Sequence, residues 1–217
     1  MKLLRHAASC RVAAIVAAGL AVSCLGSSPN VKLYTMNAAS DSLAASAPDG
    51  LAIGVGPIRV PRYLDRPEWV TRPGGSTSRL EVDDFRRWAG GFSSNVLSAL
   101  GENLGAKLET QRVLIYPAQT AFALDYRVAV DFYAFEGIGE DAVVLRASWV
   151  IRAGSAGRGP WSGQSTIRSA IAGGGSEDLV AAYNEALGLL AAEIASRIEG
   201  LEKAKARTDA SDDPLPD

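Results

Sequence analysis

Histidine and cysteine are almost absent from this chain. Its 217 residues include one histidine, His6, and two cysteines, Cys10 and Cys24. His6 and Cys10 lie in a basic, then apolar, N-terminal stretch that is typical of a secretory signal, so its removal leaves Cys24 alone. The remaining protein cannot build a Ser-His-Asp or Cys-His catalytic group or a zinc site of histidine and cysteine. It cannot form an internal disulfide either.

An excess of positive charge is also missing. The chain has 22 Lys and Arg against 24 Asp and Glu, a formal net charge of -2. Loss of Lys2, Arg5 and Arg11 with the signal would leave 19 of the 22 basic residues against the same 24 acidic ones. No nucleic acid partner is expected, because binding one requires basic side chains that neutralise phosphates. The hydrophobic share of 47% fits one globular domain with a sizeable core.

Long apolar runs are absent from the N-terminal stretch. Its apolar part, residues 12–22, is shorter than the roughly 20 residues of a membrane-spanning helix. It runs into LAVSC at residues 20–24, which resembles the lipobox of bacterial lipoproteins. The resemblance implies cleavage before Cys24 and lipidation of its thiol. Leu25 stands where an aspartate would favour retention in the inner membrane, so sorting to the outer membrane is expected. An ordinary secretory signal with a free thiol is the alternative.

The rest of the chain divides into a tether, a domain and a tail. We predict a signal peptide at 1–23, a lipidated N-terminus and flexible tether at 24–49, a single domain at 50–201 and a disordered charged tail at 202–217. Apolar spacings of three and four predict helices at about 85–108, capped by Asp83 and Asp84, and from Ser176 to about 201.

Short alternating segments predict strands before, between and after these positions. The clearest are 125–137, 142–152 and 161–171, which predict an antiparallel meander with one buried face. The order is strands, a helix, four strands and a helix. This order predicts an α+β fold, in which two amphipathic helices pack on one face of a largely antiparallel (mixed) β-sheet.

Four short features invite a catalytic or ligand-binding interpretation. They are two glycine clusters, at 54–56 and 173–175, and two carboxylate pairs, at 83–84 and 140–141. The first cluster lacks the third glycine of a dinucleotide loop, and turns, caps and hairpins explain the other three. We therefore predict no catalytic residue, no cofactor and no metal site, while an ion held by Asp and Glu alone stays open.

The segment VPRYLDRPEWVTR, residues 60–72, favours an interaction surface. It is rich in Tyr, Trp and Arg, the residue types that dominate protein interface hot spots. In the alternative interpretation its large apolar side chains belong to the core and its arginines are solvated. The predicted partner-interface residues are Tyr63, Leu64, Asp65, Arg66, Trp69 and Arg72.

Several motifs in order are similar to those of one lipoprotein family. They are YTM at 34–36, PRYLDRP at 61–67, WVTR at 69–72, RWA at 87–89, expected to open the first helix, RVAVD at 127–131 and FE at 135–136. With these motifs the chain resembles the ABC-type transport auxiliary lipoproteins, the group of paraquat-inducible protein C (PqiC).

The resemblance implies a non-catalytic outer-membrane lipoprotein, anchored through Cys24 and facing the periplasm. Its implied partner is a mammalian-cell-entry (MCE) domain protein of a lipid transport system, whose periplasm-spanning tube it would anchor or receive. A homo-oligomeric ring would fit such a tube. Two alternatives are kept: a lipid carrier with its own acyl-chain cavity, and a carboxylate-dependent hydrolase.

Overall fold

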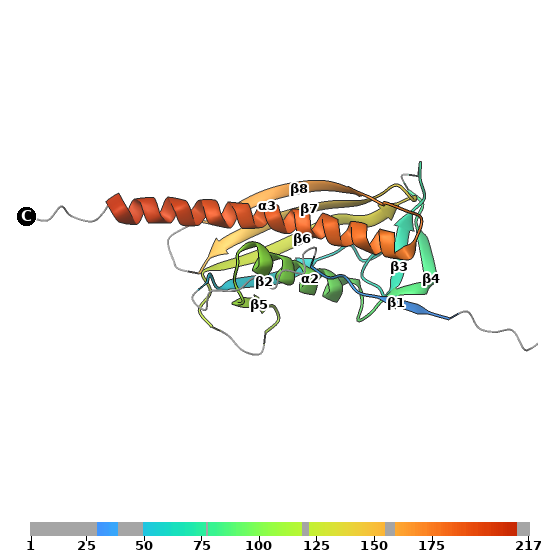
Figure 1. The fold of residues 1–217 in the computed structure, drawn as a ribbon, viewed down its shortest axis with the longest axis horizontal. Helices are drawn as coiled ribbons and strands as arrows, with labels where there is room; N and C mark the ends of the chain where they lie inside the picture. Colours follow the sequence, from blue (N-terminus) through green and yellow to red (C-terminus); the bar gives the residue numbers. More distant parts are fainter. Residues whose placement is uncertain (1–29, 39–49, 77, 119–121, 155–158, 212–217) are drawn as a thin grey trace, which may run out of the picture. The chain divides into compact units, whose positions relative to one another are not determined.

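A computed structural model describes residues 30–38, 50–76, 78–118, 122–154 and 159–211 (Figure 1). The predicted signal peptide and Cys24 lie outside these residues, as does most of the predicted tether. The described elements belong to one compact unit that begins at Lys32. Its strands are β1 (Lys32–Tyr34), β2 (Ile53–Arg59), β3 (Glu68–Arg72), β4 (Glu81–Trp88), β5 (Val113–Ile115), β6 (Tyr126–Ile138), β7 (Ala142–Ala153) and β8 (Trp161–Ala170). Its helices are α2 (Phe92–Lys107) and α3 (Ser176–Ser211).

The strands form one mixed sheet around β6. One edge of β6 pairs with β7 in antiparallel fashion along its length, and β7 pairs with β8 in the same way. The other edge of β6 is shared: β2 runs parallel to its first half and β3 parallel to its last residues. From there the sheet continues as β2–β5 on one side and β3–β4–β1 on the other. The predicted α+β class, the mixed sheet and the β6–β7–β8 meander are confirmed.

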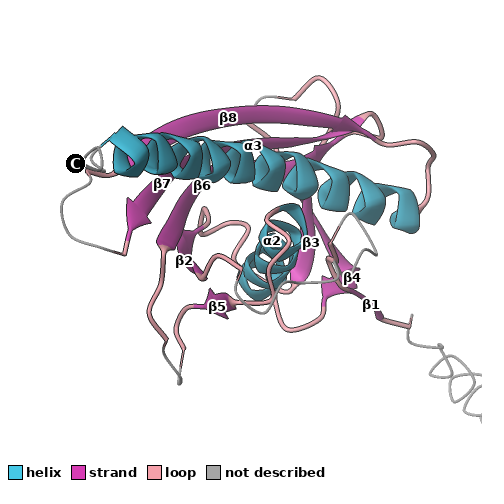
Figure 2. Ribbon diagram, turned by 60° about the vertical axis from the view of Figure 1, so that its left-hand side comes forward, coloured by secondary structure: helices cyan, strands magenta, loops and turns pink. Residues whose placement is uncertain are grey.

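Both helices pack on the same face of the curled sheet (Figures 1 and 2). α3 contacts β7 and β8, α2 contacts β2 and β5, and the two helices contact each other. The predicted apolar stripe of α3 is buried at every position: Leu179, Tyr183, Ala186, Leu190, Ile194 and Ile198. By length and composition α3 is apolar enough to cross a membrane, but this stripe is covered by the protein's own sheet and α2.

The prediction of a helix over 85–108 is wrong in its first third. Residues 81–88 form β4, which pairs with β3 as a hairpin and with β1 in parallel, and α2 begins only at Phe92. Gly90 and Gly91 separate them, with φ of 75° and 91°, values that interrupt any helix. RWA at 87–89 therefore closes a strand and does not open a helix.

Asp83 does cap backbone N–H groups, but within a strand. Its Oδ1 accepts the N–H of Phe85 at 2.8 Å and of Arg86 at 3.0 Å. These bonds stabilise a bulge at which the β3–β4 register shifts. The carboxylate thus uses the hydrogen-bond pattern of a helix cap inside β4, next to Phe85, whose side chain is 49% exposed.

The folded unit starts earlier and α3 ends later than the predicted domain limits. Residues 32–38, assigned to the tether, pack on the domain: β1 pairs with β4, and Met36 is 4% exposed and donates its N–H to Asn95 Oδ1 at 3.0 Å. At the other end, α3 continues from the buried Leu201 to Ser211. Glu202 accepts a hydrogen bond from Tyr126 at 2.6 Å, and the Lys- and Ala-rich sequence that follows favours helix.

Candidate functional site

The predicted interface segment is divided between core and surface. Leu64 and Trp69 are each only 2% exposed. The Trp69 ring lies 4.5 Å from that of Tyr34 and 5.2 Å from that of Trp88, centroid to centroid. These two members of the segment therefore hold it on the core and offer no surface of their own.

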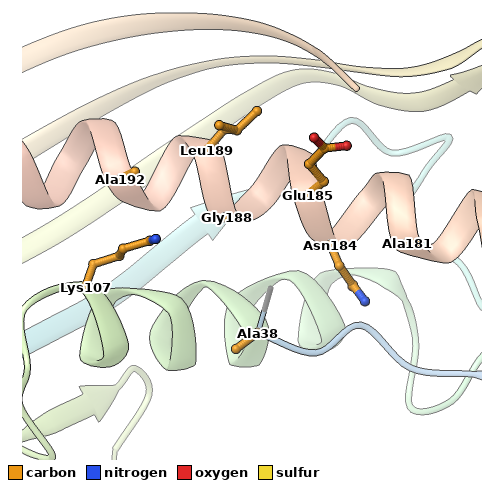
Figure 3. A pocket seen from close by; sticks show the side chains of 8 residues that line it. All are labelled: Ala38, Lys107, Ala181, Asn184, Glu185, Gly188, Leu189 and Ala192. Atoms are coloured by element: carbon orange, nitrogen blue, oxygen red, sulfur yellow. The ribbon is translucent and has the colours of Figure 1, made fainter. Parts of the chain in front are cut away.

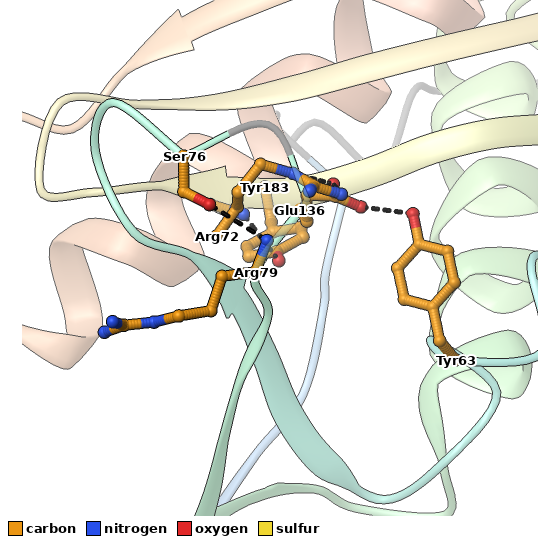
Figure 4. Close-up of polar contacts among 7 residues, drawn as sticks. Tyr63, Arg72, Ser76, Arg79, Glu136 and Tyr183 are labelled. Atoms are coloured by element: carbon orange, nitrogen blue, oxygen red, sulfur yellow. Dashed lines mark hydrogen bonds and ion pairs between the residues drawn. The ribbon is translucent and has the colours of Figure 1, made fainter.

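Tyr63 and Arg72 converge on one buried carboxylate, that of Glu136 on β6 (Figure 4). The Tyr63 hydroxyl donates to Glu136 Oε2 at 2.6 Å. Arg72 donates to Oε1 from Nη2 at 2.6 Å and from Nε at 2.9 Å. Glu136 is 2% exposed, so its charge is stabilised by these donors and not by water.

Next to this carboxylate, Tyr183 connects α3 to the same end of β6. Its hydroxyl accepts the N–H of Gly137 at 3.1 Å, and burial raises the pKa of this phenol above its ordinary value. Together, Tyr63, Arg72, Glu136 and Tyr183 form what we call the Glu136 cluster. The cluster joins the turn at 61–67, β3, β6 and α3, so it fixes how the turn is presented.

Alternation of apolar residues could not have found Glu136. Along β6 the pattern places Tyr126, Val128, Val130 and Phe132 inward, and all four are buried as predicted. A register shift between Phe132 and Ala134 then breaks the period, so that consecutive residues 134–137 are all buried. The sequence offers one signal, an acidic residue within the otherwise uncharged end of β6 at 132–138. Its partner Arg72 is brought close only by the fold.

The Glu136 cluster makes stability sensitive to alkaline pH. Burial, helped by the hydrogen bond to Glu136 and its charge, raises the pKa of Tyr63 from 10.0 to about 12. As pH rises, the unfolded chain loses this proton first, so folding stability is lost between the unfolded and the folded pKa. We expect the urea unfolding midpoint of the wild-type protein to fall more steeply above about pH 10 than that of Tyr63→Phe. Parallel falls in both proteins would contradict this role of Tyr63.

The exposed part of the segment is a charged turn. Asp65 and Arg66 are exposed, and Asp65 accepts a hydrogen bond from Ser93 near the start of α2. Arg66 pairs with Glu68 at 2.9 Å, which lowers the pKa of that carboxyl. Two backbone bonds to the carbonyl of Pro61, from Leu64 and Asp65, close the turn. The turn is therefore fixed from below by the Glu136 cluster and from the side by α2.

A pocket of about 410 Å³ lies between α2, α3 and the residue Ala38 (Figure 3). Lys107 of α2 points toward α3 across it, and Gly188 and Ala192 leave space on the α3 side. The pocket lies outside the space between helices and sheet. That space is filled by fully buried side chains, the largest of which are Phe92, Phe135, Ile53, Leu100, Leu104 and Leu145.

The remaining candidate features are occupied by structural contacts. Gly54 and Gly56 lie in β2, and the N–H of Gly175 donates to Asp178 Oδ2 at 3.0 Å, so the N-terminus of α3 is capped by its own carboxylate. Glu140 and Asp141 form the turn between β6 and β7. Over the described ranges, no three His, Cys, Asp or Glu side chains gather as a metal site would require.

These observations define a class: an α+β domain whose buried charges hold its sheet, its long helix and one exposed charged turn together. Residues 34–195 match the family described as ABC-type transport auxiliary lipoprotein component. The chain belongs to this family, as its sequence motifs predict, and is therefore related to accessory components of transport systems. None of the curated proteins compared with it matches its sequence.

Two solved structures share the fold. A protein of Xanthomonas campestris has 16% sequence identity and a TM-score of 0.61, over 81% of this chain and 99% of its own. A crystal structure of an uncharacterized protein has 16% identity and a TM-score of 0.62, over 78% of this chain and 99% of its own. At this identity the likeness extends to the fold alone.

Proposed function

We propose that the protein is a non-catalytic outer-membrane lipoprotein of an MCE-domain, ABC-type lipid transport system. In this role it anchors or receives the end of a periplasm-spanning MCE tube and so maintains envelope integrity. The match of residues 34–195 to the transport auxiliary lipoproteins carries the proposal. Cys24 in its lipobox supplies the anchor, through diacylglycerol and palmitate, and Leu25 favours the outer membrane.

The surface proposed to meet the partner is the turn at 61–67. Arg62, Asp65 and Arg66 are exposed there, while Tyr63, Leu64, Trp69 and Arg72 support the turn from beneath. A charged, fixed turn costs little conformational entropy on binding, since its backbone is already ordered. A homo-oligomeric ring would present several such turns to a ring-shaped MCE tube.

The filled interior favours this proposal over a lipid carrier. An acyl chain between the helices and the sheet would have to displace side chains such as Phe92, Leu100 and Phe135, all of which are 2% exposed or less. Loss of the packing of one large core side chain costs about 2–5 kcal/mol, so displacing several of them would be strongly unfavourable. A tethered assembly component needs no such cavity.

A pull-down from detergent-solubilised envelopes tests the partner and the turn together. We expect the wild-type protein to recover an MCE-domain protein, and Arg66→Ala to recover about tenfold less, as for the loss of about 1.4 kcal/mol of binding energy. Arg197→Ala, which removes an exposed arginine from α3, is the matched control and should leave recovery unchanged. Recovery of no MCE-domain protein by the wild type would overturn the proposed function, and an equal yield with Arg66→Ala would remove the turn from the interface.

A further inference from the structure

Exposed apolar side chains gather at β1 and β4. From Lys32 onward, seven large apolar side chains of the described residues are exposed, and three of them lie on these two strands: Leu33 at 66%, Phe85 at 49% and Val82 at 45%. The other four are on β5, α3, β6 and a loop: Ile115, Leu189, Tyr133 and Phe122. We call Leu33, Val82 and Phe85 the β1–β4 apolar face.

The strand register explains why these side chains point outward. Tyr34 pairs with Trp88, and both pack inward against Trp69. Leu33 is the neighbour of Tyr34 on the strand, so it points to the opposite side of the sheet. Phe85 stands three residues before the inward Trp88 on β4, so the alternation of the strand places it on the same outward side as Leu33. The inward packing of Tyr34 and Trp88 therefore determines which side chains of β1 and β4 point outward, and these outward side chains do not take part in the core.

Charge does not account for this surface. β1, β3 and β4 carry equal numbers of basic and acidic residues. The four basic residues are Lys32, Arg72, Arg86 and Arg87, and the four acidic ones are Glu68, Glu81, Asp83 and Asp84. Arg86 pairs with Asp83 at 2.7 Å, and Arg87 lies 3.6 Å from Glu68. With the charges balanced, exposed apolar area is what distinguishes the face, and such patches mark contact sites.

The short distance along the chain from Cys24 indicates what contacts the face. β1 begins at Lys32, eight residues after Cys24, and not after a tether that extends to residue 49. A fully extended chain spans at most about 3.3–3.6 Å per residue, so Lys32 lies within roughly 29 Å of an acylated Cys24. The apolar face starts at Leu33, and among the described residues only Asn30, Val31 and Lys32 lie closer to Cys24 in sequence.

We propose that the β1–β4 apolar face rests on the lipid bilayer, with its three side chains among the lipid headgroups. This inference depends on the proposed anchoring at Cys24. Three side chains are too few to hold a free protein on a membrane, but an anchor raises the local lipid concentration enough for a small contact to orient the domain. β1, β3 and β4 lie toward one end of α3 and its C-terminal residues lie at the other, so the charged end of α3 would point into the periplasm (Figure 1).

Quenching by lipids tests the orientation. The full chain carrying Phe85→Cys is purified in detergent, labelled with an environment-sensitive fluorophore and reconstituted into vesicles of phosphatidylethanolamine and phosphatidylglycerol. Acylation occupies the Cys24 thiol and cleavage removes Cys10, so the introduced thiol is the one that reacts. We expect spin-labelled lipids to quench this fluorophore several-fold more than one at Leu189→Cys, an equally exposed position on α3. Leu33→Cys is the second reporter and should behave like Phe85→Cys.

The outcomes separate this inference from the anchor. If the protein floats with the vesicles but labels at Leu33 and Phe85 are quenched no more than the label at Leu189, the membrane contact is wrong and the anchor stands. The introduced thiols could instead resist labelling in native envelopes while their fluorophores are not quenched in pure lipid vesicles. That result would also overturn the membrane contact, by showing that another protein or a second copy of this chain covers the face. A protein that does not float at all lacks the anchor, and both proposals fail.

Discussion

Replacing Glu136 by alanine is expected to lower the free energy of unfolding by about 3–5 kcal/mol, the usual cost of breaking a buried ion pair. The substitution removes the carboxylate that accepts hydrogen bonds from Tyr63 and Arg72, whose side chain is only 19% exposed. It also leaves space where a larger side chain filled the interior. Urea unfolding, followed by tryptophan fluorescence, measures the effect, since Trp69 and Trp88 are buried near the cluster.

Two further variants make this prediction specific. Glu136→Gln keeps the shape and an acceptor oxygen but loses the charge, so its loss of stability should be smaller than that of Glu136→Ala. Glu140→Ala removes an exposed carboxylate from the neighbouring turn and should stay within about 0.5 kcal/mol of the wild type. A loss below about 1 kcal/mol for Glu136→Ala would show that the buried pair contributes little.

Replacing Cys24 by serine is expected to release the protein from the membrane. The hydroxyl of serine does not take the place of the thiol in lipid attachment, and several acyl chains are lost together. Each buried CH₂ contributes about 0.8 kcal/mol to membrane binding, so the loss is far larger than any contact of the folded domain could replace. We expect the wild type in the membrane fraction and Cys24→Ser in the periplasmic fraction, with no palmitate label.

The adjacent position supplies the control for this result. Ser23→Ala keeps a small residue before the cysteine and should leave lipidation and membrane fractionation unchanged. The folded domain begins at Lys32, so neither substitution should alter its urea unfolding midpoint. A wild-type protein in the periplasmic fraction would argue for an ordinary secretory signal with a free thiol. A Cys24→Ser protein that remains in the membrane fraction would argue for attachment that does not depend on this thiol.

Most elements could be predicted because their apolar residues repeat with a clear period. β6, β7, β8 and α3 each present one buried face, and burial of that face dominates their stability. The helical spacing of Phe85, Trp88 and Phe92 predicts a helix where β4 forms, although Gly90 and Gly91 precede Phe92. Pairing with β1 and β3 outweighed that local pattern, as tertiary contacts often do.

The candidate site was predicted only in outline. Composition identifies residues 60–72 as rich in Tyr, Trp and Arg, but it does not show that Trp69 lies in the core and Arg66 on the surface. Nor could it pair Arg72 with Glu136, which is 64 residues away along the chain. The contact is long-range, so no short sequence pattern reveals it, and the β-bulge before Glu136 removes the periodic signal of burial.

By itself, the sequence determined the α+β class and the family and predicted an anchor at Cys24, because these depend on composition, period and short motifs. Only the tertiary structure decided that Glu136 joins the turn to α3, that the folded unit starts at Lys32, and that Leu33 and Phe85 are exposed on paired strands. The physical reason is that all three depend on strand register and long-range pairing. A shift of one residue reverses which side chains are buried, and residues distant in sequence fix that register together.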